Sequence, residues 1–372
     1  MDKQQPPLII SHGSLRGIAA LIVVGYHLQF FGDNKIWLED ITCIWSRGYV
    51  WVDFFFILSG FILTYVYGDR DVHRTPLKIR DFYVARLARV YPLHLFALCV
   101  VVCYRVFTQF YARITHSPNA IYTVPWVRLP DHLLLLQSWG IFGKPVWNIP
   151  AWSISTEMFA YLLFPLILAF SISYKKLAIA AAFTVACAFY GFVGMSSGSL
   201  DIIDGWALAR GLAGFLVGMS LCLTRSVWLR IPEKTITAIQ VSSVLAIVAL
   251  IELLPNDTFL IMPFVILIGA THDDRGVVAD GLSWAPLRKL GDWSYSIYIL
   301  HVPVLLGLSF FYPRILKFLS IEPNGLTRFI VILLLFGLSI MSASLTFAFI
   351  EKPARKWVYG KFRGSAPASP VV

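Results

Sequence analysis

The chain has 372 residues, of which 58% are hydrophobic and only 14% are charged, and its mean hydropathy is +0.71. A soluble domain carries about 25% charged residues, so this composition excludes an ordinary soluble enzyme and indicates an integral membrane protein. The net charge of +10 does not indicate a nucleic-acid-binding protein, because the basic residues follow a membrane topology.

Apolar runs long enough to cross a hydrocarbon core of about 30 Å recur along the chain. They predict an all-α, polytopic membrane helix bundle with ten transmembrane helices. The predicted spans are residues 14–31, 50–67, 90–110, 150–172, 177–193, 205–223, 236–253, 258–271, 290–312 and 327–350. No polar stretch between them is long enough for a separate soluble domain, so we expect residues 1–372 to form a single domain.

Lysine and arginine residues outside the spans are distributed unequally between the two sides. With the N-terminus in the cytoplasm, and with Arg16 assigned to the cytoplasmic edge of its span, 21 lie on the cytoplasmic side and nine on the outer side. Cytoplasmic loops of membrane proteins carry such an excess. The pattern predicts that both termini and the basic loop 70–89 face the cytoplasm.

Arg16 and His27 lie at the two ends of the apolar stretch "LRGIAALIVVGYH". They are eleven positions apart, close to three helical turns, so both side chains share one face and lie about 16 Å apart along the axis. We expect Arg16 near the cytoplasmic surface and His27 beneath the outer one. The alternatives to functional roles are a snorkelling anchor for Arg16 and a packing residue for His27.

Three further charged residues, Asp53, Glu157 and Arg210, fall within spans that enter the membrane from the outer side. Together with His27 they are expected to converge on the outer half of the bilayer. Ionisable groups at this depth are costly and usually mark a functional site. A structural ion pair, such as Glu157 with Arg210, is the alternative.

A second cationic cluster, Arg80, Arg86 and Arg89, precedes or opens the third span. Arg86 and Arg89 share a helix face, and guanidinium groups suit a phosphate-bearing ligand. A positive-inside anchor is the alternative. No cysteine and histidine residues have metal-ligand spacing, so no metal site is predicted.

Six segments, in chain order, resemble motifs of the acyltransferase-3 family, whose members O-acylate bacterial cell-surface sugars. They are the R-x10-H pair Arg16 and His27, "WVDFFFILSGF", "RLARVYP", "WSISTEMFAYLLFP", "GDWSYSIYILHVPV" and "FIEKPAR". The resemblance covers essentially the whole chain, without the extracellular hydrolase-like domain fused to some members. Two positions depart from the basic motif, because Ala85 replaces an arginine and His94 replaces a tyrosine. We therefore expect a thinner phosphate clamp, for which Arg80 compensates.

The resemblance implies a multi-pass O-acyltransferase of the bacterial cytoplasmic membrane. It would move an acyl group, expected to be acetyl, from cytoplasmic acetyl-CoA to a sugar hydroxyl of a cell-surface polysaccharide or lipid-linked oligosaccharide. The expected ligands of the CoA phosphates are Arg16, Arg86 and Arg89.

On this reading His27 is the general base, since an unperturbed imidazole suits proton transfer near neutral pH. Asp53 or Glu157 would orient the imidazole, as the acid does in a Ser-His-Asp triad. Three residues are candidates for acceptor binding or oxyanion support: Trp152, Ser153 and Arg210.

Aromatic residues of the outer segment 111–149 suit a saccharide, although an interfacial aromatic belt is the alternative. These residues are Trp126, Trp139 and Trp147. His301 either lines an acyl channel or packs as a hydrogen-bonded histidine. A transporter or flippase of an envelope precursor is the rival function, and the R-x10-H pair argues against it. An acyltransferase that acts on a small molecule is a third possibility.

Overall fold

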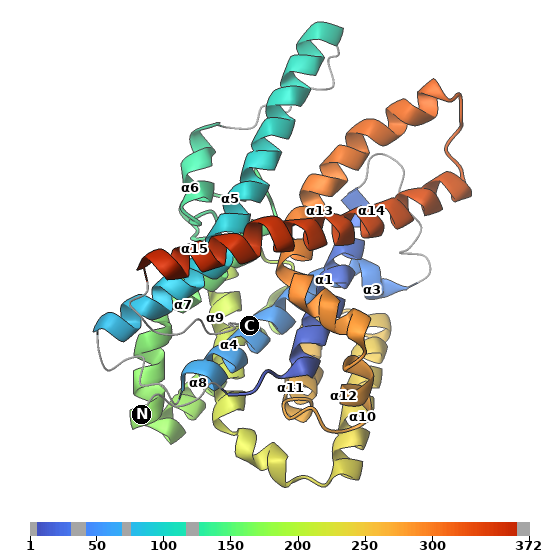
Figure 1. Ribbon diagram of the computed structural model, residues 1–372. Coiled ribbons are helices and arrows are strands. Elements are labelled where there is room, and N and C mark those ends of the chain that lie inside the picture. Colours follow the sequence, from blue (N-terminus) through green and yellow to red (C-terminus); the bar gives the residue numbers. More distant parts are fainter. Residues whose placement is uncertain (1–5, 31–41, 69–75, 117–125, 363–372) are drawn as a thin grey trace.

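A computed structural model describes residues 6–30, 42–68, 76–116 and 126–362 (Figure 1). These residues form helices joined by turns and short loops, and no strand occurs among them. The predicted all-α fold is thus confirmed for the described residues. Residues 70–75 of the predicted cytoplasmic loop lie outside them.

The helices follow one another along the chain with few long connections. They are α1 (Ile10–His27), α3 (Cys43–Ser46), α4 (Trp51–Tyr67), α5 (Pro76–Thr115), α6 (Leu129–Leu133), α7 (Ala151–Ser173), α8 (Lys175–Ser196), α9 (Ala207–Leu223), α10 (Glu233–Leu253), α11 (Ile261–Ala270), α12 (Val277–Leu282), α13 (Ala285–Phe318), α14 (Gly325–Thr346) and α15 (Lys352–Phe362). A π-helical turn, Phe347–Glu351, joins α14 to α15.

Each of the ten predicted spans coincides with a helix. Seven helices of the described residues are long and apolar enough to cross a bilayer. The spans that correspond to α1, α9 and α11 are not among these seven. Several membrane helices are therefore present, while the count of ten stays a prediction.

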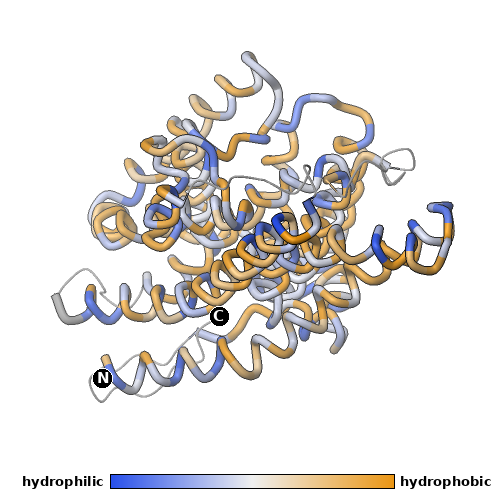
Figure 2. Tube along the Cα trace, turned by 90° about the horizontal axis from the view of Figure 1, so that it is seen from above, coloured by the Kyte–Doolittle hydropathy of each residue, from blue (hydrophilic) through white to orange (hydrophobic). Residues whose placement is uncertain are grey.

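The side chains that point away from the helix bundle are apolar, as contact with lipid requires. Phe183 on α8, Leu245 on α10 and Phe329 on α14 are 67%, 63% and 56% exposed. Hydrophobic residues predominate along the helices (Figure 2). Such a surface would be unfavourable in water and matches hydrocarbon.

Hydrogen bonds join helix ends that the predicted topology places on the same side of the membrane. At the ends predicted to be cytoplasmic, the backbone amides of Ile10 and Ser11 donate to the carboxylate of Asp274, at 2.9 and 2.8 Å. At the ends predicted to be outer, the hydroxyl of Tyr49 donates to Asp257 at 2.7 Å. The start of α1 therefore lies beside the end of α11, and the start of α4 beside the start of α11, so α1 runs opposite to α4 and α11. Which side faces the cytoplasm stays a prediction.

Glycines let two pairs of helices pack backbone against backbone. In the α4–α9 pair, a Cβ on Gly60 would lie 2.0 Å from the carbonyl oxygen of Phe215, and one on Gly218 would lie 1.8 Å from that of Ile57. The α1–α13 pair makes a similar approach at Gly17 and Gly291. Small residues give membrane helices close van der Waals contact, and these contacts hold the helices that carry Arg16 and the motif residue Ser59.

We predict that Gly218→Ala destabilises the protein by about 1–3 kcal/mol, because the new methyl group overlaps a backbone oxygen that cannot move alone. Thermal unfolding in detergent measures the change. Gly337→Ala on α14 is the matched control, since no atom beyond the adjoining turns of its own helix lies within 4 Å of the added Cβ. Equal melting temperatures for the two variants would contradict the close approach.

The topology predicts that a cysteine at Glu322, between α13 and α14, reacts with a membrane-impermeant maleimide in intact cells. A cysteine at Lys234, at the start of α10, should react only after permeabilisation. Both positions are exposed, and the native cysteines are replaced first. The reverse labelling pattern would invert the topology.

Candidate active site

One cavity brings together residues from α1, α4, α5, α7 and α13. Its polar lining consists of Arg16, Ser59, Arg86, Arg89, Ser153, Glu157, Tyr161, Ser294, Tyr295 and Tyr298. The three arginines that the sequence assigned to a phosphate ligand thus line the same cavity as Glu157 and Ser153. Apolar side chains of α4, including Phe55 and Leu58, complete the wall.

Glu157 lies in the cavity wall with two hydroxyl donors on one carboxylate oxygen. Ser59 Oγ donates to Oε1 at 2.6 Å, and the hydroxyl of Tyr161, one turn along α7, donates to the same atom at 2.5 Å. The side chain is half-buried. Within the described ranges it makes no ion pair, and it lines the cavity.

Arg86 is 3% exposed and packs between two aromatic rings. Its guanidinium carbon lies 5.6 and 5.8 Å from the ring centres of Tyr67 and Tyr161, a cation–π arrangement. The tyrosine faces therefore hold Arg86 in place without neutralising its charge.

Arg89 is neutralised by a residue that we did not predict as part of the site. It forms an ion pair with Glu351 at the end of the π-helical turn. Glu351 is 1% exposed, accepts a hydrogen bond from Ser296 Oγ at 2.9 Å and lies 3.6 Å from Arg355. The motif "FIEKPAR" was the available sequence signal, because it places a carboxylate next to an apolar span.

Arg80 does not contribute to the cavity. It is exposed and donates to the carbonyl of Phe362 on α15. The expectation that Arg80 compensates for the missing arginine at Ala85 is therefore wrong in this structure.

Asp53 and Arg210 pair with each other inside the bundle. Arg210 Nη2 lies 2.6 Å from Asp53 Oδ2, and both residues have no exposed surface. The guanidinium also donates to the carbonyls of Tyr49 and Ile202, at 3.0 and 3.1 Å. It stacks over Trp152, 5.0 Å from the ring. The alternative pairing of Arg210 with Glu157 is therefore wrong.

His27 ends α1, and a backbone carbonyl orients its imidazole. Nδ1 lies 2.9 Å from the oxygen of Val23. The rings of Tyr26, Phe30 and His301 surround it, with ring centres 5.0, 5.8 and 4.5 Å away. In the described part of the chain neither Asp53 nor Glu157 reaches His27, so the expected carboxylate contact is not formed.

Ser153 and Tyr298 line the cavity, whose lining includes neither His27 nor His301, and Tyr298 also contacts His301. Their hydroxyl oxygens are 2.7 Å apart, and each hydroxyl also lies 3.1 Å from the carbonyl of Pro150. The ring of Tyr298 is 5.9 Å from that of His301. Of the three predicted acceptor ligands, Ser153 lines the cavity, whereas Trp152 and Arg210 belong to the buried cluster around Asp53.

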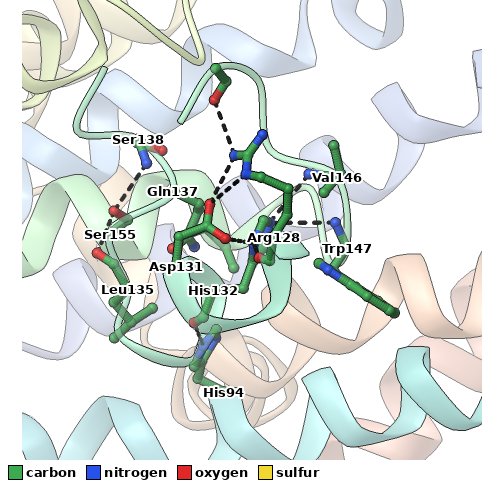
Figure 3. Close-up of polar contacts among 12 residues, drawn as sticks. His94, Arg128, Asp131, His132, Leu135, Gln137, Ser138, Val146, Trp147 and Ser155 are labelled. Carbon is green, nitrogen blue, oxygen red and sulfur yellow. Dashed lines mark hydrogen bonds and ion pairs between the residues drawn. The ribbon is translucent and has the colours of Figure 1, made fainter. Parts of the chain in front are cut away.

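A polar network holds the outer segment in place (Figure 3). Arg128 Nη2 donates to Asp131 at 2.8 Å, and His132 Nδ1 donates to the carbonyl of Arg128 at 2.8 Å. His132 Nε2 accepts the backbone amide of Val146 at 3.2 Å. His94 contacts the carbonyl of His132 through Nε2 at 2.8 Å. His132 is thus a structural histidine, and His94 fastens this segment to α5.

The three outer tryptophans are not equally available to a saccharide. Trp147 is 1% exposed, and Trp139 is half-buried against Phe159. Trp126 is 46% exposed, and its ring centre lies 5.0 Å from that of Trp147 with the ring planes tilted by 58°. Trp147 is therefore buried in the protein, whereas Trp126, and in part Trp139, keep exposed surface; a saccharide contact stays a prediction.

We predict that Asp53→Ala costs about 3–5 kcal/mol of stability, because it leaves the guanidinium of Arg210 buried without its counter-charge. Asp53→Ala combined with Arg210→Met should recover part of this loss. Thermal unfolding in detergent measures both variants. Glu157→Gln is the control, since its side-chain oxygen still accepts from Ser59. An Asp53→Ala protein as stable as the wild type would contradict a structural pair.

Residues 13–350 match the acyltransferase domain called acyltransferase-3. The chain is 29% identical to the acyltransferase MdmB of Streptomyces mycarofaciens, over 81% of this chain and 80% of MdmB. It is 26% identical to the putative peptidoglycan O-acetyltransferase YrhL of Bacillus subtilis, over 94% of this chain and 55% of YrhL.

The O-acetyltransferase OatA of Staphylococcus aureus is 24% identical, over 92% of this chain and 56% of OatA. The chain therefore spans little more than half the length of YrhL and OatA. No solved structure matches it. Because the family match covers nearly the whole chain, the protein belongs to the acyltransferase-3 family.

Proposed function

We propose that this protein is an O-acyltransferase of the bacterial cytoplasmic membrane that transfers an acetyl group from acetyl-CoA to a hydroxyl of a cell-surface glycan or lipid-linked saccharide. The observation that carries the proposal is the shared cavity, which joins a cationic end to the hydroxyl pair of Ser153 and Tyr298. The relatives YrhL and OatA, which are named as O-acetyltransferases, support the acetyl group and the hydroxyl acceptor.

Arg16 and Arg86 suit the phosphates of CoA. Each has a buried Nε without a hydrogen-bond partner among the described residues. Buried donors are normally satisfied, so both side chains have unused capacity for an anion. Arg89 would contribute less, because Glu351 already neutralises it. The pantetheine arm would then extend along the cavity past Glu157 toward Ser153.

His27 suits the role of general base. A carbonyl only accepts hydrogen bonds, so the contact with Val23 puts the proton of the neutral ring on Nδ1. Nε2 then carries the lone pair that can remove a proton. As the acceptor oxygen attacks the thioester carbonyl, its proton moves to Nε2, and collapse of the tetrahedral intermediate releases the CoA thiolate.

Glu157 stays a proposed catalytic residue, although it would act on the ligand in the cavity and would not orient the imidazole of His27. Its charge is presented beside the path of the donor, held by Ser59 and Tyr161. Asp53 acts in this proposal through its pair with Arg210, which supports Trp152 and hence the start of α7. Ser153 remains the proposed acceptor or oxyanion ligand.

The proposal predicts that Arg16→Ala and His27→Ala fail in different ways. Loss of a charge-assisted contact to phosphate, typically about 1.5–3 kcal/mol, should weaken acetyl-CoA binding by roughly 10- to 150-fold in Arg16→Ala. His27→Ala should bind acetyl-CoA normally and lose about 10²–10⁴ in transfer rate. Calorimetry on the purified protein and O-acetyl analysis of surface glycans measure the two effects.

Arg80→Ala is the matched control, since Arg80 is a basic residue of α5 that lies outside the cavity, and acetyl-CoA binding should not change. A fully active His27→Ala protein would remove the base. Unchanged affinity in Arg16→Ala would move the donor site toward Arg86. Glycan acetylation that is identical with and without the gene would favour the transporter or the small-molecule acceptor.

A further inference from the structure

Two histidines from distant parts of the chain stand side by side near the outer end of α1. The ring centres of His27 and His301 are 4.5 Å apart, and the planes meet at 67°. His301 lies on α13 and has no exposed surface. The close packing of α1 on α13, at Gly17 and Gly291, brings these helices together.

The hydrogen bonds of His301 determine where its proton lies. Nδ1 is 2.6 Å from the carbonyl oxygen of Tyr298, which only accepts, so the neutral ring carries its proton on Nδ1. Nε2 then carries a lone pair, and this buried atom has no hydrogen-bond partner among the residues described. His27 has the same tautomer through Val23. The two rings thus both have a proton-accepting Nε2.

The charged groups nearby are already engaged. Asp53 on α4 is paired with Arg210, and Glu157 on α7 accepts from Ser59 and Tyr161. Asp201, in the loop before α9, lies 3.3 Å from the hydroxyl of Tyr26.

The titratable side chains whose rings contact the two histidines are the phenols of Tyr26 and Tyr298. In the described ranges no carboxylate forms an ion pair with either imidazole. The ring in contact with His27 thus carries a buried acceptor nitrogen, His301 Nε2, that has no hydrogen-bond partner among the described residues.

We propose that His301 is the positioning residue of the general base: its Nε2 accepts a hydrogen bond from His27 Nε2–H while His27 holds the reaction's proton. The inference rests on the proposed function. In a Ser-His-Asp triad the carboxylate holds the ring nitrogen that does not react. Here the carbonyl of Val23 holds that nitrogen, Nδ1, and His301 stabilises the protonated Nε2.

The transfer needs no reactant besides the acyl thioester and the acceptor hydroxyl. The acceptor's O–H bond breaks, its oxygen forms the new bond to the acyl carbon, and the proton passes to His27 Nε2. The C–S bond then breaks, and the proton leaves the histidine pair for the thiolate sulfur. The products are the acyl ester and CoA as its thiol.

The test is a double-mutant cycle with acetyl transfer and acetyl-CoA affinity measured on each protein. His301→Phe keeps a ring in the space and removes the acceptor nitrogen. It should lower kcat about 10- to 100-fold, as expected for a lost hydrogen bond to a charged group, with acetyl-CoA affinity unchanged. In the His27→Ala background the same change should lower the residual rate less than threefold, because the group it acts through is gone. His301→Gln, whose side-chain oxygen accepts a hydrogen bond, should recover part of kcat.

Buried His94, on α5, supplies the matched control. His94→Phe removes its contact to the carbonyl of His132, so any loss of rate should be equal in the wild-type and His27→Ala backgrounds. An equal loss for His301→Phe in both backgrounds would show that His301 only packs, and unchanged kcat would overturn the inference while leaving the proposed function intact. Full activity of His27→Ala would overturn both.

Discussion

A charge in the interior of a membrane protein must have a partner or a function, because hydrocarbon offers neither hydrogen bonds nor screening. In this protein some buried charges form ion pairs and the others line a cavity. Arg210 is neutralised by Asp53, and Arg89 by Glu351. Arg16, Arg86 and Glu157 instead face one cavity, so the pairing of the first group determines which charges remain for a ligand.

The polarity of the cavity follows from this division. Arg86 is held by tyrosine faces and Glu157 by hydroxyl groups, and neither interaction cancels the charge. Cations and a carboxylate from different helices thus lie along one path. Such an arrangement suits a long ligand that is anionic at one end and reacts at the other, as the proposed acyl-CoA donor does.

Close helix packing sets the positions of these groups. The backbone approach of α4 to α9 at Gly60 and Gly218 holds Ser59 beside the cavity. The approach of α1 to α13 brings Arg16 to the wall and His27 to His301. The adjacent motif residues Ser59 and Gly60 therefore have different roles. Ser59 supplies a hydroxyl to Glu157, and Gly60 allows the helix contact that positions Ser59.

Much of the architecture could be predicted from the sequence. Every apolar run that was predicted to span the membrane overlaps a helix of the structure. This was predictable because a membrane imposes length and hydropathy on each segment separately. The spacing of Arg16 and His27 also predicted that both lie on one helix, and both belong to α1. Local signals of this kind need no knowledge of neighbouring helices.

Which groups pair across helices is a different question, and only the tertiary structure decided it. The sequence by itself determined that buried acids and bases exist, but Asp53 and Glu157 are both carboxylates in apolar spans and look alike. The structure assigns Arg210 to the first and Ser59 and Tyr161 to the second. It also places His301 beside His27 and pairs Glu351 with Arg89. The order in which helices pack, and not their hydropathy, sets the distance between side chains more than 250 residues apart.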